Sequence, residues 1–240
     1  MLPRGLLCLI ATLFLCSCAS VSVKKQQYLS AHLPKRVPQK ILVKPLAFYT
    51  PALQVGRDGE RLSHFQYEFQ EKFTSALSDS LTQYVGRVQP IAATAPLPRG
   101  NYWLISGRFD RVSQGSRLLR SLVGFGWGAT KLETSILVTD LSGPQPRSFL
   151  LIETSGGSNA LPGVVSTTGV AVGGVASVAG GGALLNSTRS GLTFDAQRTA
   201  EEVSAALSEY LYQQGAIPYE QAIAPKRSTA VTILPYSDSR

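Results

Sequence analysis

One segment of the chain limits most strongly how the rest can fold. The thirty-five residues from Thr154 to Thr188 carry no ionisable side chain, and residues 163–185 contain only Gly, Val, Ala, Leu, Ser and Thr. Small residues recur there at a spacing of four: Gly169, Gly173, Ser177 and Gly181. We therefore expect a Gly-rich, uncharged insertion over residues 156–191, set between a strand and a helix.

Three conformations of this insertion remain open. The spacing of small residues would give a helix one smooth stripe for close contact with a second helix, and 23 residues are long enough to cross a hydrocarbon core. Each internal glycine costs a helix about 1 kcal/mol, however, and six valines lower its propensity further. The alternatives are a hairpin turning at Gly173-Gly174, with a ring of subunits closing a pore, and a glycine-rich loop or flap packed locally. In the first two cases the four small residues would contact the membrane or another subunit.

The N-terminus has the layout of an export signal. Arg4 precedes an apolar run from Leu6 to Leu15, which is too short to span a bilayer. The segment 15–18 (Leu-Cys-Ser-Cys) resembles the bacterial lipobox, in which a cysteine receives a diacylglycerol before cleavage. We predict a lipoprotein signal peptide over residues 1–17 and lipidation of Cys18, with palmitate completing the anchor. The alternatives are a secretory signal that is cut elsewhere and a retained cytosolic N-terminus.

Lipidation of Cys18 would determine where the protein resides. Ala19 and Ser20 follow the cysteine, and the absence of Asp at the second mature position resembles lipoproteins that are sorted to the outer membrane. We expect an outer-membrane protein whose domain faces the periplasm, held to the lipid bilayer through acylated Cys18. Cys8 and Cys16 would leave with the signal peptide, so disulfides and cysteine metal sites are excluded.

The charge is distributed unevenly along a chain of net charge +8. Seven cations and no carboxylate lie between Cys18 and Arg57. We predict a basic, flexible tether over residues 18–39, either drawn to anionic headgroups or simply solvated. Nucleic acid is not an expected partner, because an exported, lipid-tethered chain does not normally meet it.

Hydrophobic periodicity predicts the remaining elements. Phe65, Phe69, Phe73, Leu77 and Leu81 repeat every four residues, which predicts a helix over 63–84 with a capping box at its start. A second amphipathic helix is expected over 195–213, with Asp195 as its N-cap. Strands are expected at 41–49, 85–91, 101–112, 131–141 and 147–154.

These elements predict a single periplasmic domain over residues 40–213. The fold class is α+β or α/β, with a mixed sheet of about five strands covered by two helices. Residues 214–240, which contain three prolines, are expected to form a loose C-terminal tail.

A glycine-rich connection between two expected strands provides a family resemblance. Residues 115–128 read GSRLLRSLVGFGWG, and a strand ending at Thr139-Asp140 with a turn at Gly143 follows them. This arrangement resembles the uncharacterised bacterial lipoprotein family DUF4410, over about residues 40–213. Membership implies secretion, lipidation and a periplasmic α/β domain, but no reaction. The residues of a possible functional loop are Arg117, Arg120, Gly124, Gly126 and Gly128.

Catalytic constellations are absent from the sequence. The spacing of residues 115–128 lacks the terminal Lys-Ser/Thr of a phosphate-binding loop, and no HExxH, GxSxG or paired-cysteine pattern occurs. The histidines are His32 and His64, and Asp110 and Asp140 are isolated acids near strand ends. We therefore expect a protein that is not an enzyme and needs no metal or cofactor.

The predicted function is that of a non-catalytic outer-membrane lipoprotein. It would serve as an envelope accessory or assembly factor that binds a protein partner through its periplasmic domain. The alternative is a subunit of an oligomeric outer-membrane secretion or transport channel, in which residues 163–185 form the membrane element. A homo-oligomer is possible in either case.

Overall fold

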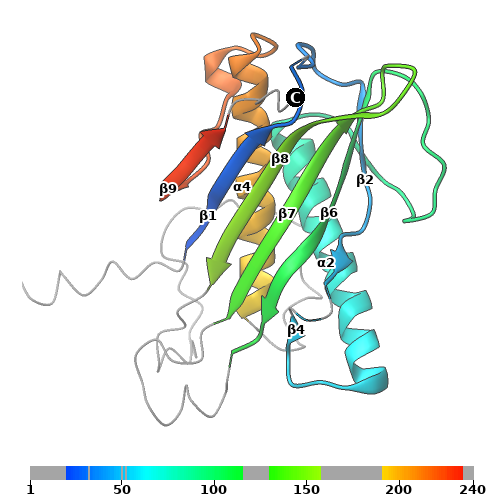
Figure 1. The fold of residues 1–240 in the computed structure, drawn as a ribbon, viewed down its shortest axis with the longest axis vertical. Helices are drawn as coiled ribbons and strands as arrows, with labels where there is room; N and C mark the ends of the chain where they lie inside the picture. The colour runs from blue at the N-terminus through cyan, green and yellow to red at the C-terminus, as the bar shows by residue number, and fades with distance from the viewer. Residues whose placement is uncertain are drawn as a thin grey trace, which may run out of the picture.

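The computed structural model describes residues 20–31, 33–49, 51, 53–115, 130–157 and 191–234. These residues form one mixed nine-stranded sheet, and both long helices pack on the same face of it (Figure 1). The strands are β1 (Ser20–Tyr28), β2 (Lys40–Val43), β3 (Ala47–Phe48), β4 (Leu53–Gln54), β5 (Val88–Pro90), β6 (Tyr102–Ser113), β7 (Lys131–Asp140), β8 (Arg147–Gly157) and β9 (Arg227–Leu234). The fold is therefore α+β as expected, with nine described strands in place of about five.

The order of the strands is β5-β2-β6-β7-β8-β1-β9, and the short strands β3 and β4 also pair with β6. The four central strands β6, β7, β8 and β1 are antiparallel to one another in this order. At one edge β2 is parallel to both β6 and β5, and at the other edge β9 is parallel to β1. Each of the four long strands in the middle of this order has a paired neighbour on both sides, so none of them forms an edge of the sheet.

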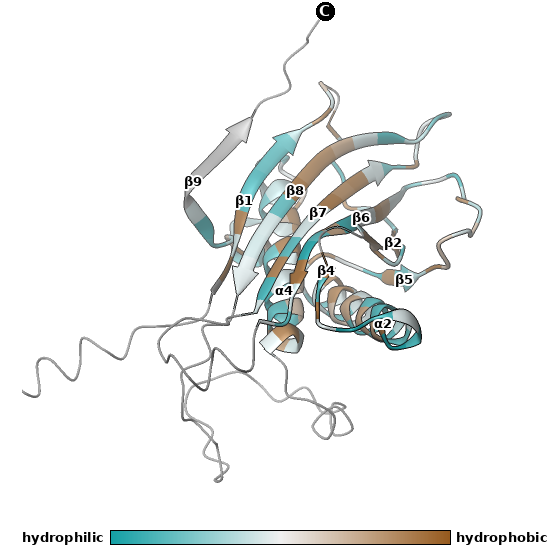
Figure 2. Cartoon of the chain, turned by 60° about the horizontal axis from the view of Figure 1, so that its bottom comes forward, coloured by the Kyte–Doolittle hydropathy of each residue, from teal (hydrophilic) through white to brown (hydrophobic). Residues whose placement is uncertain are grey.

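The core lies between the sheet and helices α2 (Gly59–Tyr84) and α4 (Gly191–Gln213), whose hydrophobic sides face the strands (Figure 2). The five aliphatic and aromatic residues expected to line the first helix are all buried. Alternate residues of β7 complete the core from the sheet, as the period-two pattern requires: Leu132, Thr134, Ile136 and Val138. The expectation that two amphipathic helices cover one face of the sheet is therefore confirmed (Figure 1).

Helix α2 begins at Gly59, four residues earlier than expected, and α4 is already helical at Gly191, the first residue that the structure describes after position 157. Ser63 is not a cap, because its hydroxyl donates to the carbonyl of Gly59 within the first turn of α2, at 3.4 Å. Asp195 is not an N-cap either, since α4 is already helical at Gly191. The residue at the cap position of α2 is Asp58, whose side chain makes no capping hydrogen bond.

The predicted flexible tether is wrong for residues 20–28, which form strand β1. This strand pairs with β8 and β9, so the folded sheet includes residues before Lys40. Val21 and Val23 are buried and provide the hydrophobic side of the strand. The pairing shifts register between Val23 and Lys25, which turns Gln26 inward and interrupts the alternation that marks a strand.

The predicted loose tail is also wrong, at least up to Leu234. A 3-10 turn at Tyr219–Gln221 is followed by β9, which adds to the edge of β1. The guanidinium of Arg227 donates two hydrogen bonds to the carboxylate of Glu209 on α4. The segment after α4 is thus held to both layers of the fold.

The sheet has two ends, which we name by the residues of β1. At the Ser20 end, β1 and β7 begin and β6 and β8 finish, as their registers require. At the Tyr28 end, the Tyr28 hydroxyl donates to Gln213 at the end of α4, at 2.7 Å. Helix α4 therefore runs from the Ser20 end to the Tyr28 end (Figure 1). Within the described ranges, neither helix is apolar enough over a sufficient length to traverse a bilayer.

Candidate functional site

The residues that the sequence singled out lie outside the described part of the chain. They are Cys18, the loop residues Arg117, Arg120, Gly124, Gly126 and Gly128, and the small residues Gly169, Gly173, Ser177 and Gly181. The structure nevertheless fixes the residues that flank each of these segments. Their positions show where each segment is connected to the described part of the fold.

All of these flanking residues meet at the Ser20 end. Ser20, two positions after Cys18, pairs with Gly157, the last residue of β8 before residues 158–190. Ser113, just before the expected functional loop, pairs with Lys131, which lies just after that loop. The predicted lipidation site, the glycine-rich connection and the uncharged segment are therefore all attached to one end of the domain.

A tightly packed junction holds these strand ends together. The hydroxyl of Thr130 donates to the buried carboxylate of Asp195 on α4, at 2.5 Å, and so links the start of β7 to the helix. A Cβ atom on Gly157 would lie 2.3 Å from the carbonyl oxygen of Thr130, and one on Gly156 would lie 2.3 Å from a methyl group of Val21. Only glycine allows β8 to approach its neighbours this closely.

The open face of the sheet carries a charge cluster close to this junction. The ammonium groups of Lys24 and Lys131 lie 3.8 and 3.3 Å from the same carboxylate oxygen of Glu133. Burial acts to raise the pKa of Glu133, but the hydrogen bond from Lys131 and the charge of Lys24 outweigh it, so the pKa lies below its usual value. With one ionised carboxylate between two ammonium groups, the cluster carries a net positive charge at neutral pH.

An exposed aromatic ring stands beside the junction on the helical layer. Phe194 lies in the first turn of α4, next to Asp195, and its side chain is 58% exposed. Side chains of an α-helix lean towards its N-terminus, so this ring leans towards the Ser20 end. The Ser20 end thus combines an apolar group on one layer with cations on the other.

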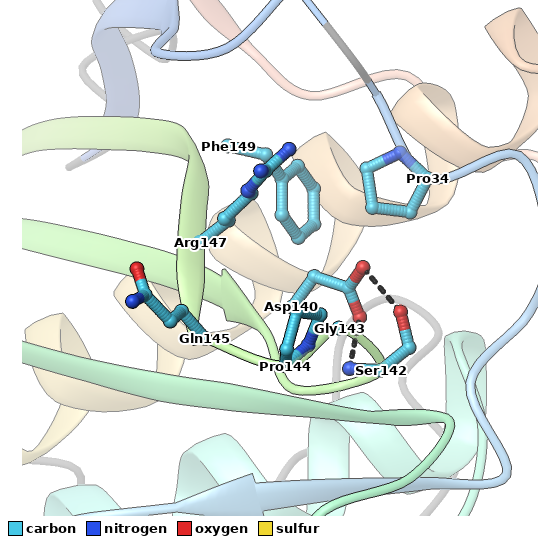
Figure 3. Close-up of a pocket in the computed structure, with 8 residues that line it drawn as sticks. All are labelled: Pro34, Asp140, Ser142, Gly143, Pro144, Gln145, Arg147 and Phe149. Carbon is cyan, nitrogen blue, oxygen red and sulfur yellow. Dashed lines mark hydrogen bonds between the residues drawn. The ribbon is translucent and has the colours of Figure 1, made fainter.

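The opposite end of the sheet contains a shallow cavity of about 240 Å³ (Figure 3). It lies at the turn between β7 and β8, beside Pro34, and Arg147 and Phe149 contribute to its wall. The carboxylate of Asp140 accepts hydrogen bonds from the amide and the hydroxyl of Ser142, at 3.0 and 2.7 Å. This geometry is that of an Asx turn, which stabilises the hairpin.

The other isolated polar residues from the sequence also make local contacts. Asp110 accepts hydrogen bonds from Arg108 and Ser135 across β6 and β7. His64 lies on the surface of α2, 3.8 Å from Glu68. In the described ranges there is no group of three or more His, Cys, Asp or Glu side chains that could hold a metal ion.

Sequence reasoning did not find the Thr130–Asp195 junction. The two residues are separated by 65 positions, and a single Thr and a single Asp carry no pattern that pairs them. The glycine pair at 156–157 was a usable signal, because adjacent glycines at the end of an expected strand indicate close backbone approach.

Two solved structures show a distant likeness to this chain. Both are PelC dodecamers from Paraburkholderia phytofirmans, and each is 14% identical in sequence. The first covers 82% of this chain and 99% of its own with a TM-score of 0.41. The second, a variant in which one leucine is replaced by methionine, covers 59% and 85% with a TM-score of 0.34.

The sequence comparisons address the expected family directly. No curated protein is significantly similar in sequence. The family model for the domain of unknown function DUF4410 matches residues 57–179, just over half of the chain. That range runs from the start of α2 through β8 and includes the glycine-rich connection on which the resemblance rested. The chain therefore belongs to the DUF4410 family.

Proposed function

We propose that this chain is a non-catalytic outer-membrane lipoprotein that acts as an envelope accessory or assembly factor. It is held to the bilayer through acylated Cys18 and binds a protein partner with its periplasmic domain. The family assignment transfers no reaction to it, so the proposal rests on the residues and on their places in the fold.

The observation that carries the proposal is the position of Ser20. Strand β1 begins there, and one residue, Ala19, separates it from Cys18. An extended chain spans at most about 3.6 Å per residue, so a lipid on Cys18 would lie within roughly 7 Å of the sheet. Such a short link would hold the domain against the membrane with a defined end towards it, which suits a protein that presents a binding surface.

The second candidate is a subunit of an oligomeric channel that uses residues 163–185 as its membrane element. One observation favours it: residues 158–190, which contain this element, are connected to the described fold at Gly157, opposite Ser20, and at Gly191. Both of its attachment points therefore lie at the end of the domain that a lipid on Cys18 would hold at the bilayer.

The first experiment tests the anchor. Cells expressing the wild-type chain or Cys18→Ser are fed radiolabelled palmitate and then fractionated. The proposal requires label in the wild-type chain, in the outer-membrane fraction, and none in the variant. An unlabelled wild-type chain in the soluble fraction would refute the lipoprotein assignment.

A second pair of variants distinguishes the adaptor from the channel. Cys18→Ser is compared with the same variant in which a short Gly/Ser loop replaces residues 163–185, and the size of each is measured in detergent. An adaptor would be small and soluble in both forms. A channel subunit would remain in a large detergent-solubilised assembly as Cys18→Ser and would leave it only when the segment is replaced.

A further inference from the structure

We propose that the Ser20 end of the domain is a seat for an anionic bilayer surface, with the Phe194 ring at the interface and Lys24 and Lys131 facing lipid phosphates. This inference deepens the proposed function, because it names the surface that meets the membrane. The groups proposed to contact lipid all belong to residues that the structure describes.

The apolar part of the seat is the Phe194 ring. Helix α4 is otherwise buried along most of its length, and Phe194 is its exposed large hydrophobic residue at the Ser20 end. An exposed aromatic ring in the first turn, leaning towards the start of the helix, can enter the boundary between headgroups and acyl chains.

The charged part of the seat is the lysine pair around Glu133. Lys24 and Lys131 are both about half exposed, and they share one carboxylate. Glu133 lies two residues beyond Lys131, which at about 3.3 Å per residue places it roughly 7 Å along the strand. The headgroup layer of a bilayer is about as thick, so both ammonium groups can reach lipid phosphates while the end of the sheet touches the bilayer.

The two parts act together because the junction fixes them relative to each other. Thr130 precedes Lys131 and donates to Asp195, and Asp195 follows Phe194. One hydrogen bond therefore connects the strand with the lysine to the helix with the ring. Strand β1 begins at Ser20, at the same end of the sheet and two positions after Cys18. A lipid on Cys18 would therefore bring this surface, rather than any other, to the bilayer.

The test measures which end of the protein touches lipid. The acylated chain is reconstituted into phosphatidylethanolamine and phosphatidylglycerol vesicles, with an environment-sensitive fluorophore on Phe194→Cys. Tyr219→Cys is the matched control, since Tyr219 is 72% exposed beyond the other end of α4. Lipids that carry a quencher should remove much of the fluorescence at position 194 and leave position 219 unchanged. Equal quenching at both positions would overturn the seat.

The charged part is tested on the same labelled protein. Lys24→Gln combined with Lys131→Gln should reduce quenching at position 194, as should vesicles of phosphatidylcholine alone. Lys40→Gln combined with Arg147→Gln, at the Tyr28 end, should leave it unchanged. If position 194 is unquenched and Phe194→Cys instead forms disulfide-linked pairs of chains, the surface contacts a second copy and the lipid seat is wrong.

Failure of the seat and failure of the anchor can be distinguished. If the chain incorporates palmitate but shows no quenching at position 194, the lipid anchor is supported and the proposed membrane-contacting surface is refuted. The chain could instead incorporate no palmitate and still cosediment with anionic vesicles, with Phe194→Ser abolishing the cosedimentation. In that case the lipid anchor is refuted and the membrane-contacting surface is supported.

Discussion

At the scale of single residues, Gly107 shows how little room the central strands leave. It lies in the middle of β6, opposite Ile136, and a Cβ atom there would lie 2.2 Å from the carbonyl oxygen of Ser135. Gly107→Ala must displace β7, so we expect it to lower the free energy of unfolding by about 1–3 kcal/mol, measured in urea. Gly143→Ala is the control, because its Cβ would meet nothing closer than 3.5 Å. Equal stability of the two variants would contradict this account.

Glu202 gives the stability of the fold a dependence on pH. Its carboxylate is buried on α4 and accepts a hydrogen bond from the amide of Lys226, at 2.6 Å. Burial raises the pKa of Glu202, and the contacts with Lys226 offset only part of that rise. The folded state therefore favours the protonated carboxyl, and this contribution to stability is present below the ordinary glutamate pKa and is lost as the pH rises through the folded pKa.

Glu202→Gln keeps an acceptor for the Lys226 amide and cannot ionise. Between pH 4 and pH 7, we expect the wild-type chain to lose stability relative to this variant, in unfolding measured at each pH. Glu71→Gln, on the exposed side of α2, removes the same charge without the burial and should follow the wild-type curve. A constant difference between Glu202→Gln and the wild-type chain across this range would show that ionisation of Glu202 does not matter.

At the scale of elements, β1 shows what sequence patterns can and cannot predict. The two helices were found because their hydrophobic residues recur without interruption, and β7 because its buried and open-face residues alternate along most of its length. Strand β1 alternates only at Val21 and Val23 before the register shift places Gln26 inside. The second half of β1 contains two lysines and two glutamines, which is a composition typical of a linker, so its sequence did not indicate a strand.

Val23 provides the test that β1 belongs to the fold. Val23→Asp places a charge in the core, and we expect it to cost about 3 kcal/mol or more in thermal or urea unfolding. Ser22→Asp is the matched control, because the neighbouring side chain points to the open face of the sheet. A flexible tether would tolerate both substitutions equally.

Strand β9 was missed for a different reason, since its place depends on a contact with a distant helix. Arg227 and Glu209 form a partly buried, two-pronged ion pair between β9 and α4. Arg227→Leu leaves the carboxylate without this partner, and we expect a loss of about 1–3 kcal/mol together with faster amide exchange in residues 227–234. The double variant Arg227→Glu with Glu209→Arg, which reverses the two charges, should recover part of the lost stability. If the ion pair contributes nothing, amide exchange in residues 227–234 will be the same in all variants.

At the scale of the whole molecule, the convergence of chain segments could not be predicted from the sequence. Each segment was recognisable by itself: residues 15–18 by their resemblance to a lipobox, residues 163–185 by their lack of charge, and residues 115–128 by their glycines. Their common location follows from the antiparallel order of β6, β7, β8 and β1, which no local pattern encodes. The fold thus turns three separate sequence features into one end of a domain.

The short link between Cys18 and Ser20 should therefore matter as much as the lipid itself. A Gly/Ser spacer of about twelve residues inserted after Ala19 would have a root-mean-square length of roughly 20 Å, enough to free the domain from the bilayer. We expect unchanged palmitate incorporation and unchanged outer-membrane fractionation, but loss of quenching at a fluorophore on Phe194→Cys. The same spacer in the exposed turn after Ala92, in the connection between β5 and β6, should leave the quenching intact. If the spacer after Ala19 has no effect, the seat binds lipid without help from the anchor, and the length of the link imposes no orientation.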